Sequence, residues 1–195
     1  MRVMIRPVAM ELMVVASLPA LPACCSARES VPESYAPEPP EPPEPPEPGE
    51  SAMALQVTST AFTDEGDIPS PFTCDGDDAA LPLSWTAGPE GTKSYALIMD
   101  DPDAPGGTWV HWVAWNIRET SLPAAAEEGT NSWKRTGYGG PCPPTGVHRY
   151  YFKVYALDAE LSLGAKTTKS DLLRAMEGRI LAQGQLMGRY RRAGR

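Results

Sequence analysis

Short runs of alternating hydrophobic and polar residues occupy most of the chain after its first quarter. Residues 55–62 alternate with a period of two, which is typical of a strand with one buried face. Two shorter runs, residues 83–86 and 94–99, are bounded by Pro, Gly and Asp and predict further strands. Residues 109–117 and 148–157 are longer and rich in aromatic and β-branched residues, so we expect them to be central strands of a sheet.

One segment near the C-terminus has a helical period instead. Ser170 fits an N-cap, and Asp171 suits the first turn, where a negative charge interacts favourably with the helix dipole. Gly184 would end this helix, and residues 185–190 would return as a last strand. The apolar residues on one face of the expected helix are Leu172, Leu173, Met176, Ile180 and Leu181. Many short strands with one or two peripheral helices predict a mainly β fold, a sandwich or a barrel.

The first 25 residues have the pattern of an export signal. Arg2 and Arg6 supply a positive start, and residues 12–21 form an apolar stretch within the ~7–15 residues expected. A membrane-spanning helix needs ~20 apolar residues, so this stretch is too short to be one. Residues 21–24 resemble the lipobox of bacterial lipoproteins, in which Cys24 would be lipidated. We expect an exported protein of the cell envelope, either anchored to a membrane through Cys24 alone or freely periplasmic after ordinary signal cleavage.

Residues 26–52 predict a disordered Pro/Glu-rich spacer. Nine of the 22 prolines fall between Pro32 and Pro48, and residues 37–48 repeat Pro-Glu-Pro. Such a segment cannot bury apolar surface, and its like charges keep it extended. A polyproline II helix rises ~3.1 Å per residue, so residues 37–48 would hold a folded domain roughly 35–40 Å from an anchor. The alternative is a neutral low-complexity insert.

Charge and composition place one folded domain in residues 53–195. The whole chain has a net charge of −8, but residues 53–195 hold 14 Lys and Arg against 17 Asp and Glu, a difference of only −3. Hydrophobic residues make up 42% of the chain, close to the globular average of ~45–50%. A nucleic-acid partner bound through a basic face is disfavoured by this balance.

Candidate binding chemistry concentrates around the chain's two histidines. His111 and His148 lie on the two longest expected strands, and each follows a loop stiffened by Pro and Gly, residues 100–107 and 138–147. Imidazoles and loop N–H groups can donate hydrogen bonds to an anion, and a carboxylate such as Asp101 could orient a ring and hold its proton. We therefore expect both histidines in one pocket rather than as core residues bonded to the backbone.

A metal site built from His111, His148, Asp101 and Asp103 is an alternative, because all four are legitimate ligand types. Their spacing matches no zinc motif, so we expect neither a metal nor another cofactor. Only Cys142 near His148 suggests a catalytic pair, and the chain has no Gly-x-Ser-x-Gly, P-loop or Rossmann pattern. The sequence therefore favours a protein that is not an enzyme.

The cysteines of the expected domain are Cys74 and Cys142. In an exported protein they could form a disulfide, with Cys24 and Cys25 left in the processed region. The enclosed loop of roughly 70 residues would contribute on the order of 4 kcal/mol in the chain-entropy model. Two free thiols in the pocket loops are the alternative.

Four short motifs surround the two histidines: Asp-Pro-Asp-Ala-Pro at residues 101–105, His-Trp at 111–112, Gly-Pro at 140–141 and Pro-Thr-Gly-Val-His-Arg-Tyr at 144–150. In this order they resemble the phosphatidylethanolamine-binding protein family, and more narrowly its bacterial, Raf kinase inhibitor-like branch. The likeness runs from about residue 55 to residue 191. It implies a β-sandwich with short helices and a small pocket that takes phosphate or a phospholipid head group.

The resemblance also implies roles for particular residues. Asp103 and Arg149 would brace the loops, with Arg149 paired to a loop carboxylate, and Gly140 would lend a backbone N–H to the ligand. The bond between Ala104 and Pro105 would be cis. The residues that would form the ligand pocket are Asp101, Pro105, Trp109, His111, Gly140, Pro141, His148 and Tyr150.

A second function is implied by the same family resemblance. The protein would inhibit or regulate a protein partner, of the serine protease or kinase type, through the surface around the pocket. No motif in the sequence is specific for that activity.

Overall fold

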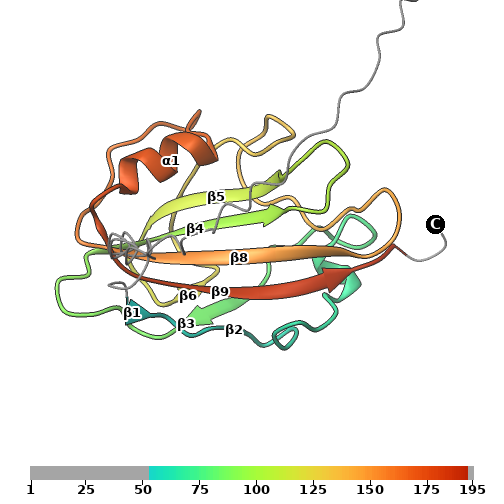
Figure 1. Ribbon diagram of the computed structural model, residues 1–195, viewed down its shortest axis with the longest axis horizontal. Coiled ribbons are helices and arrows are strands. Elements are labelled where there is room, and N and C mark those ends of the chain that lie inside the picture. Colours follow the sequence, from blue (N-terminus) through green and yellow to red (C-terminus); the bar gives the residue numbers. More distant parts are fainter. Residues whose placement is uncertain (1–52, 193–195) are drawn as a thin grey trace, which may run out of the picture. The chain divides into compact units, whose positions relative to one another are not determined.

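The computed structural model describes residues 53–192 (Figure 1). The expected export signal, the candidate lipobox at Cys24 and the spacer of residues 26–52 lie outside the described residues. In chain order the elements are β1 (Met53–Ala54), β2 (Val57–Ser59), the 3-10 helix η1 (Ser70–Phe72), β3 (Leu83–Trp85), β4 (Ser94–Asp101), β5 (Trp109–Ile117), β6 (Ser121–Leu122), β7 (Glu127–Glu128), β8 (His148–Leu157), α1 (Lys169–Met176) and β9 (Ile180–Tyr190).

These elements form a β-sandwich with one peripheral α-helix, which confirms the expected fold class. The large sheet has the strand order β1-β9-β8-β4-β5-β7, and the small sheet has the order β2-β3-β6. Figure 1 shows α1 on one side of the large sheet and β2 and β3 on the other. One apolar core fills the space between the sheets, and a second, smaller one lies between the large sheet and α1. No helix within residues 53–192 is long and apolar enough to cross a membrane.

Strand β4 lies in the middle of the large sheet and is buried on both faces along its whole length. Leu97 and Met99 face the core between the sheets, whereas Ala96 and Ile98 face the core beneath α1. Burial on two faces explains why residues 95–99 of this strand are continuously apolar instead of alternating. The same burial encloses the carboxylate of Asp101, which ends the strand and is 3% exposed.

The strands expected at residues 109–117 and 148–157 are present with those bounds as β5 and β8. Both pair antiparallel with β4, one on each side. Asp101 at the end of β4 is paired with Trp109 at the start of β5, and Asp100 is paired with Tyr151 near the start of β8. Antiparallel pairing therefore gathers one end of β4 and the beginnings of β5 and β8 at the same end of the sheet.

The helix differs from the expectation at its beginning. Thr168, not Ser170, is the N-cap: its hydroxyl accepts a hydrogen bond from the Asp171 N–H. The Asp171 carboxylate in turn accepts from the Thr168 N–H at 3.0 Å. This reciprocal capping box places the first helical residue at Lys169.

The helix also ends earlier than expected, at Met176. Gly178 adopts a positive φ of 71°, and Ile180 and Leu181 belong to β9 rather than to the helix face. Strand β9 pairs with β8 over nearly its full length, and these ladder hydrogen bonds prevail over the local helical period. Gly184 therefore lies inside a strand, where a Cβ would stand 2.0 Å from the Leu55 carbonyl oxygen.

Candidate functional site

A cavity of about 210 Å³ lies at the end of the large sheet where β4, β5 and β8 come together. The described residues that line it are Asp101, Ala104, Pro105, Trp109, His111, Trp133, Cys142 and Pro144. Four of the expected pocket residues are thus in its wall: Asp101, Pro105, Trp109 and His111. The other four, Gly140, Pro141, His148 and Tyr150, are not among the described lining residues.

His148 reaches the cavity through Asp101. Its Nδ1 donates to Asp101 Oδ2 at 2.7 Å, and both side chains are buried. The other oxygen of that carboxylate, Oδ1, accepts from the Asp103 N–H at 2.8 Å. Asp101 therefore has a fixed orientation, and it holds the proton of His148 on Nδ1.

His111 lies in the cavity wall with a fixed tautomer. Its Nδ1 is 2.7 Å from the Gly139 carbonyl oxygen, and because a carbonyl can only accept, Nδ1 must carry the proton. Burial lowers the pKa of His111 below its ordinary value, although the Gly139 carbonyl and the Asp101 carboxylate raise it in part. The ring is 2% exposed and is held neutral by this environment.

Four aromatic rings form a continuous edge-to-face row along this wall. The ring centroids of Trp109 and Trp133 are 5.4 Å apart, those of Trp133 and His111 are 4.9 Å apart, and those of His111 and Tyr150 are 5.2 Å apart. Trp133 was not among the pocket residues expected from the sequence. It lies in a polar loop and is 37% exposed, and that polar context was the one signal that could have identified it.

Two buried hydrogen-bond donors beside the cavity have no partner among the described residues: the Trp109 Nε1–H and the Tyr150 hydroxyl. The Asp101 carboxylate and the Cys142 backbone lie beside the Tyr150 hydroxyl. Burial, and then the charge of Asp101, raise the pKa of Tyr150 far above its usual range, so the hydroxyl keeps its proton. An unpaired buried donor costs about 1–3 kcal/mol, so both groups favour an acceptor brought by a ligand.

The loop at 138–142 is fastened to the segment that contains η1. Cys74 and Cys142 form a disulfide with an S–S distance of 2.05 Å. Next to it, the Tyr138 hydroxyl donates to the Phe72 carbonyl at 2.6 Å, and the Cys74 N–H donates to the Pro141 carbonyl at 3.2 Å. Because Cys142 Sγ is bonded to Cys74, it is not a thiolate nucleophile in this structure.

The role expected for Gly140 is wrong. Its N–H donates to Asp78 Oδ1 at 2.6 Å, so this group is already used inside the protein and is not offered to a ligand. The position still requires glycine, because a Cβ would lie 2.6 Å from the Phe72 carbonyl oxygen. Gly140 therefore acts by allowing two loops to approach each other closely.

Asp103 and Arg149 join the other two loops at the cavity. The Asp103 carboxylate accepts from Arg149 Nε at 2.9 Å, from Nη2 at 2.7 Å and from the Arg149 backbone N–H at 2.9 Å. The guanidinium hydrogen bonds lower the pKa of Asp103 from 3.8 to about 2. This two-pronged pair connects the turn after β4 to the first residues of β8.

The cis bond expected between Ala104 and Pro105 is not found. The cis peptide bond in residues 53–192 is Leu122–Pro123. The Gly107 N–H donates to the Ala104 carbonyl at 3.0 Å, which closes a turn with Pro105 in its second position. A trans proline suits that position, whereas cis proline belongs to the third position of a different turn type.

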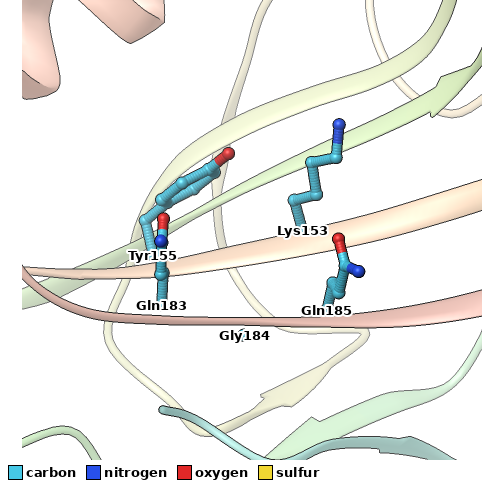
Figure 2. Close-up of a pocket in the computed structure, with 5 residues that line it drawn as sticks. All are labelled: Lys153, Tyr155, Gln183, Gly184 and Gln185. Atoms are coloured by element: carbon cyan, nitrogen blue, oxygen red, sulfur yellow. The ribbon is translucent and has the colours of Figure 1, made fainter. Parts of the chain in front are cut away.

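A second hollow, of about 420 Å³, lies on β8 and β9 (Figure 2). Figure 2 shows Lys153, Tyr155, Gln183 and Gln185 extending from the same side of the two strands. The Lys153 Nζ also forms a salt bridge with Asp100 Oδ1 at 3.2 Å. This hollow has no histidine and no buried unpaired donor among its lining residues, in contrast to the cavity around His111. Within residues 53–192, no group of three or more His, Cys, Asp and Glu residues is arranged to hold a metal ion.

Comparison with known proteins identifies relatives over the whole folded part. Residues 58–191 match the family model described as phosphatidylethanolamine-binding protein. A UPF0098 protein of Methanothermobacter thermautotrophicus is 47% identical over 150 residues, which are 71% of this chain and 99% of that protein. A UPF0098 protein of Aquifex aeolicus is 44% identical over 152 residues, which cover 71% of this chain and 89% of the relative.

Solved structures agree with these sequence matches. A phosphatidylethanolamine-binding protein homolog of Chlamydia trachomatis superposes with a TM-score of 0.69 at 41% identity, covering 72% of this chain and 99% of its own. E. coli YbcL, described as a new member of the mammalian family, superposes with a TM-score of 0.66 at 29% identity and the same coverage. The family model spans well over half of the chain, and the relatives are matched almost end to end. The chain therefore belongs to the phosphatidylethanolamine-binding protein family.

Proposed function

We propose that the cavity around His111 binds a phosphate-type anion, either free or as the head group of a phospholipid, and that the protein is a binding protein rather than an enzyme. The observation that carries this proposal is the buried, unpartnered Trp109 Nε1–H in the cavity wall, with the unpartnered Tyr150 hydroxyl next to it behind His111. A phosphate oxygen is an acceptor and would satisfy the Trp109 N–H. The family's description as phosphatidylethanolamine-binding supports the same class of ligand.

The surrounding groups have complementary roles in this proposal. Asp101 holds His148 in one tautomer and so fixes the orientation of its ring. The pairing of Asp103 with Arg149 and the disulfide at Cys142 keep the two cavity loops in place before a ligand arrives. A site preorganised in this way loses little conformational entropy on binding.

The N-terminal pattern extends the proposal to the cell envelope. An export signal in residues 1–25, a lipid on Cys24 and a spacer at 26–52 would hold the binding domain near a membrane surface, within reach of phospholipid head groups. Replacement of the anchor site tests this part directly. Cys24→Ser should move the protein from the membrane fraction to the soluble fraction, and unchanged fractionation would refute the anchor.

The test of binding is thermal unfolding of the protein with phosphate or phosphorylethanolamine, against chloride at matched ionic strength. Both ligands should raise the melting temperature. Trp109→Phe keeps an aromatic ring but removes the indole N–H, and it should reduce the shift in melting temperature. His148→Ala removes the imidazole that Asp101 holds, and it should abolish the shift in melting temperature. A full shift in both variants would exclude the cavity as the binding site.

A protein partner is the second candidate function, and one observation favours it. The large hydrophobic side chains that are exposed within residues 53–192 are Trp133, Val147 and Leu173. Trp133 lines the cavity, and Val147 lies in the loop that leads to His148. A protease or kinase inhibited by this protein would contact these exposed side chains at the edge of the cavity. If Val147→Ser weakens capture of such a partner while phosphate binding is unchanged, the partner contacts the exposed edge and not the cavity itself.

A further inference from the structure

The hydrogen-bonding character of His111 is determined by its backbone partner. Nδ1 donates to the Gly139 carbonyl, so the second nitrogen of the neutral ring, Nε2, is an acceptor. Nε2 receives no hydrogen bond from the described residues. His111 lines the cavity, so an arriving ligand meets an acceptor at this position and not a donor.

The cavity therefore presents two kinds of group. Trp109 in its wall has an unpaired N–H, and Tyr150, which packs against His111 behind the wall, has an unpaired O–H, whereas Asp101 and His111 in the wall offer acceptors. A fully deprotonated phosphate carries acceptors only. It would satisfy the Trp109 N–H but would place an oxygen against the Asp101 carboxylate or against the lone pair of His111. A ligand that fits every group must also bring one proton.

The charged and titratable groups around His111 do not supply that proton in the free protein. On the β4 side lie the carboxylates of Asp100 and Asp101, and on the β8 side lies Tyr150, which keeps its own proton. The loop before β8 contributes the carbonyl groups of Gly139 and Gly140. Burial outweighs these favourable contacts and lowers the pKa of His111, which leaves the ring neutral at pH 7.

We propose that the cavity selects phosphate monoesters over phosphodiesters, because it binds the phosphoryl group together with one proton held between a ligand oxygen and His111 Nε2. The inference rests on the proposed function and narrows the ligand class of the same site: a free monoester head group is preferred over the same group in an intact phospholipid, which is a diester. The proton balance is simple: a monoester dianion, one solvent proton and the free site give the complex, and no covalent bond changes. A diester has no second proton to bring near neutral pH, so it would bind only by protonating His111 itself.

The pH dependence follows from the ligand's own titration. The second pKa of a phosphate monoester is about 6. Above that pH the free ligand has lost the proton that the complex retains, so the apparent Kd should rise about tenfold per pH unit between pH 7 and 9. At pH 8 close to one proton should be taken up for each ligand bound.

The experiment is calorimetry of the full chain with phosphorylethanolamine at pH 8, in two buffers with different ionisation enthalpies. The difference in binding heat should correspond to uptake of about one proton per site. Glycerophosphoethanolamine is a soluble diester with the same amine. At pH 7 its affinity should be at least about tenfold lower than that of phosphorylethanolamine, because it lacks one charge-assisted hydrogen bond. Binding to vesicles that contain phosphatidylethanolamine tests the same diester group in an intact lipid.

Two variants locate the proton. His111→Gln replaces the imidazole with an amide, which takes up no proton in this pH range, so the apparent Kd should change less than about twofold per pH unit. Gln185→Ala, in the hollow on β8 and β9, is the matched control and should leave the affinity and the pH slope unchanged. The measurement on the unaltered protein stands even if His111→Gln fails to fold.

The outcomes separate this inference from the function on which it rests. No binding of either ester at any pH would refute the proposed function. Binding without proton uptake, with a flat pH profile or with equal affinity for monoester and diester, would overturn the inference and leave the proposed function intact. A full pH slope in His111→Gln would show that the proton is held elsewhere and would remove His111 from this role.

Discussion

Tyr150→Phe offers the most direct test of the cavity, because removal of one oxygen atom should have opposite effects on the free protein and on the complex. The side chain is fully buried, and its hydroxyl has no hydrogen-bond partner within the described residues. The free protein therefore carries an unsatisfied polar group whose burial costs about 1–3 kcal/mol. Phenylalanine keeps the ring against His111 and removes that cost.

The expected result is a free energy of unfolding that is about 1 kcal/mol higher in the ligand-free variant. For a domain of this size that corresponds to roughly 3 °C in melting temperature. With phosphorylethanolamine present, the order should reverse. The variant loses one hydrogen bond to the anion, and a loss of about 1.4 kcal/mol weakens binding about tenfold.

Tyr95→Phe is the matched control. Tyr95 is also buried, at 6% exposed, but its hydroxyl accepts from the Gly88 N–H at 2.9 Å. The same chemical change there leaves a backbone donor unpaired, so it should lower the free energy of unfolding by about 1 kcal/mol and leave ligand affinity unchanged. The assay is urea or thermal unfolding of both variants, with and without ligand.

Two results would refute this reasoning. If Tyr150→Phe destabilises the free protein as much as Tyr95→Phe does, then the Tyr150 hydroxyl is already satisfied. If Tyr150→Phe is more stable but binds phosphorylethanolamine as tightly as the unaltered protein, the hydroxyl is unpaired but takes no part in the site.

Three further changes test the framework of the cavity. Replacing both Cys74 and Cys142 by Ser removes a disulfide between residues 68 positions apart. The free energy of unfolding should fall by on the order of 4 kcal/mol, and the urea midpoint should fall accordingly. An unchanged midpoint would show that the neighbouring hydrogen bonds hold the loops without the disulfide. Arg149 lowers the pKa of Asp103 from 3.8 to about 2, so the stability this carboxylate contributes is complete above pH 4 and is lost as the pH falls through about 2. Asp103→Asn should therefore flatten the stability profile between pH 4 and pH 2, and a slope as steep as that of the unaltered protein would contradict the assignment. Gly140→Ala places a Cβ within 2.6 Å of the Phe72 carbonyl oxygen, so the melting temperature should drop and phosphate binding should weaken. A melting curve that coincides with that of the unaltered protein would mean that the loops move apart without loss of stability.

The sequence alone was enough to identify the strands with the strongest local pattern. Residues 109–117 and 148–157 were expected as strands, and they form β5 and β8 with the same bounds. Aromatic and β-branched residues in an uninterrupted run favour one conformation locally, so little depends on distant parts of the chain. The family could also be recognised before any coordinates, because its motifs are continuous short segments around the two histidines.

Features that depend on partners far along the chain were not predictable in this way. Ile180 and Leu181 continue the helical period of residues 172–176, yet they join β9 because β8 offers them a full ladder of hydrogen bonds. The Gly140 N–H had been expected to face a ligand, but Asp78, 62 positions away, accepts its hydrogen bond. Such a competitor leaves no trace in the local sequence.

Sequence thus determined which residues have binding chemistry and which segments become strands, since both follow from residue type and short-range periodicity. The tertiary structure decided how that chemistry is arranged. Antiparallel pairing around β4 brought Asp101 beside Trp109, and burial left two donors unpaired. A backbone carbonyl turned His111 into an acceptor. Hydrogen-bond direction and desolvation depend on three-dimensional neighbours, and for that reason they emerge only once the chain has folded.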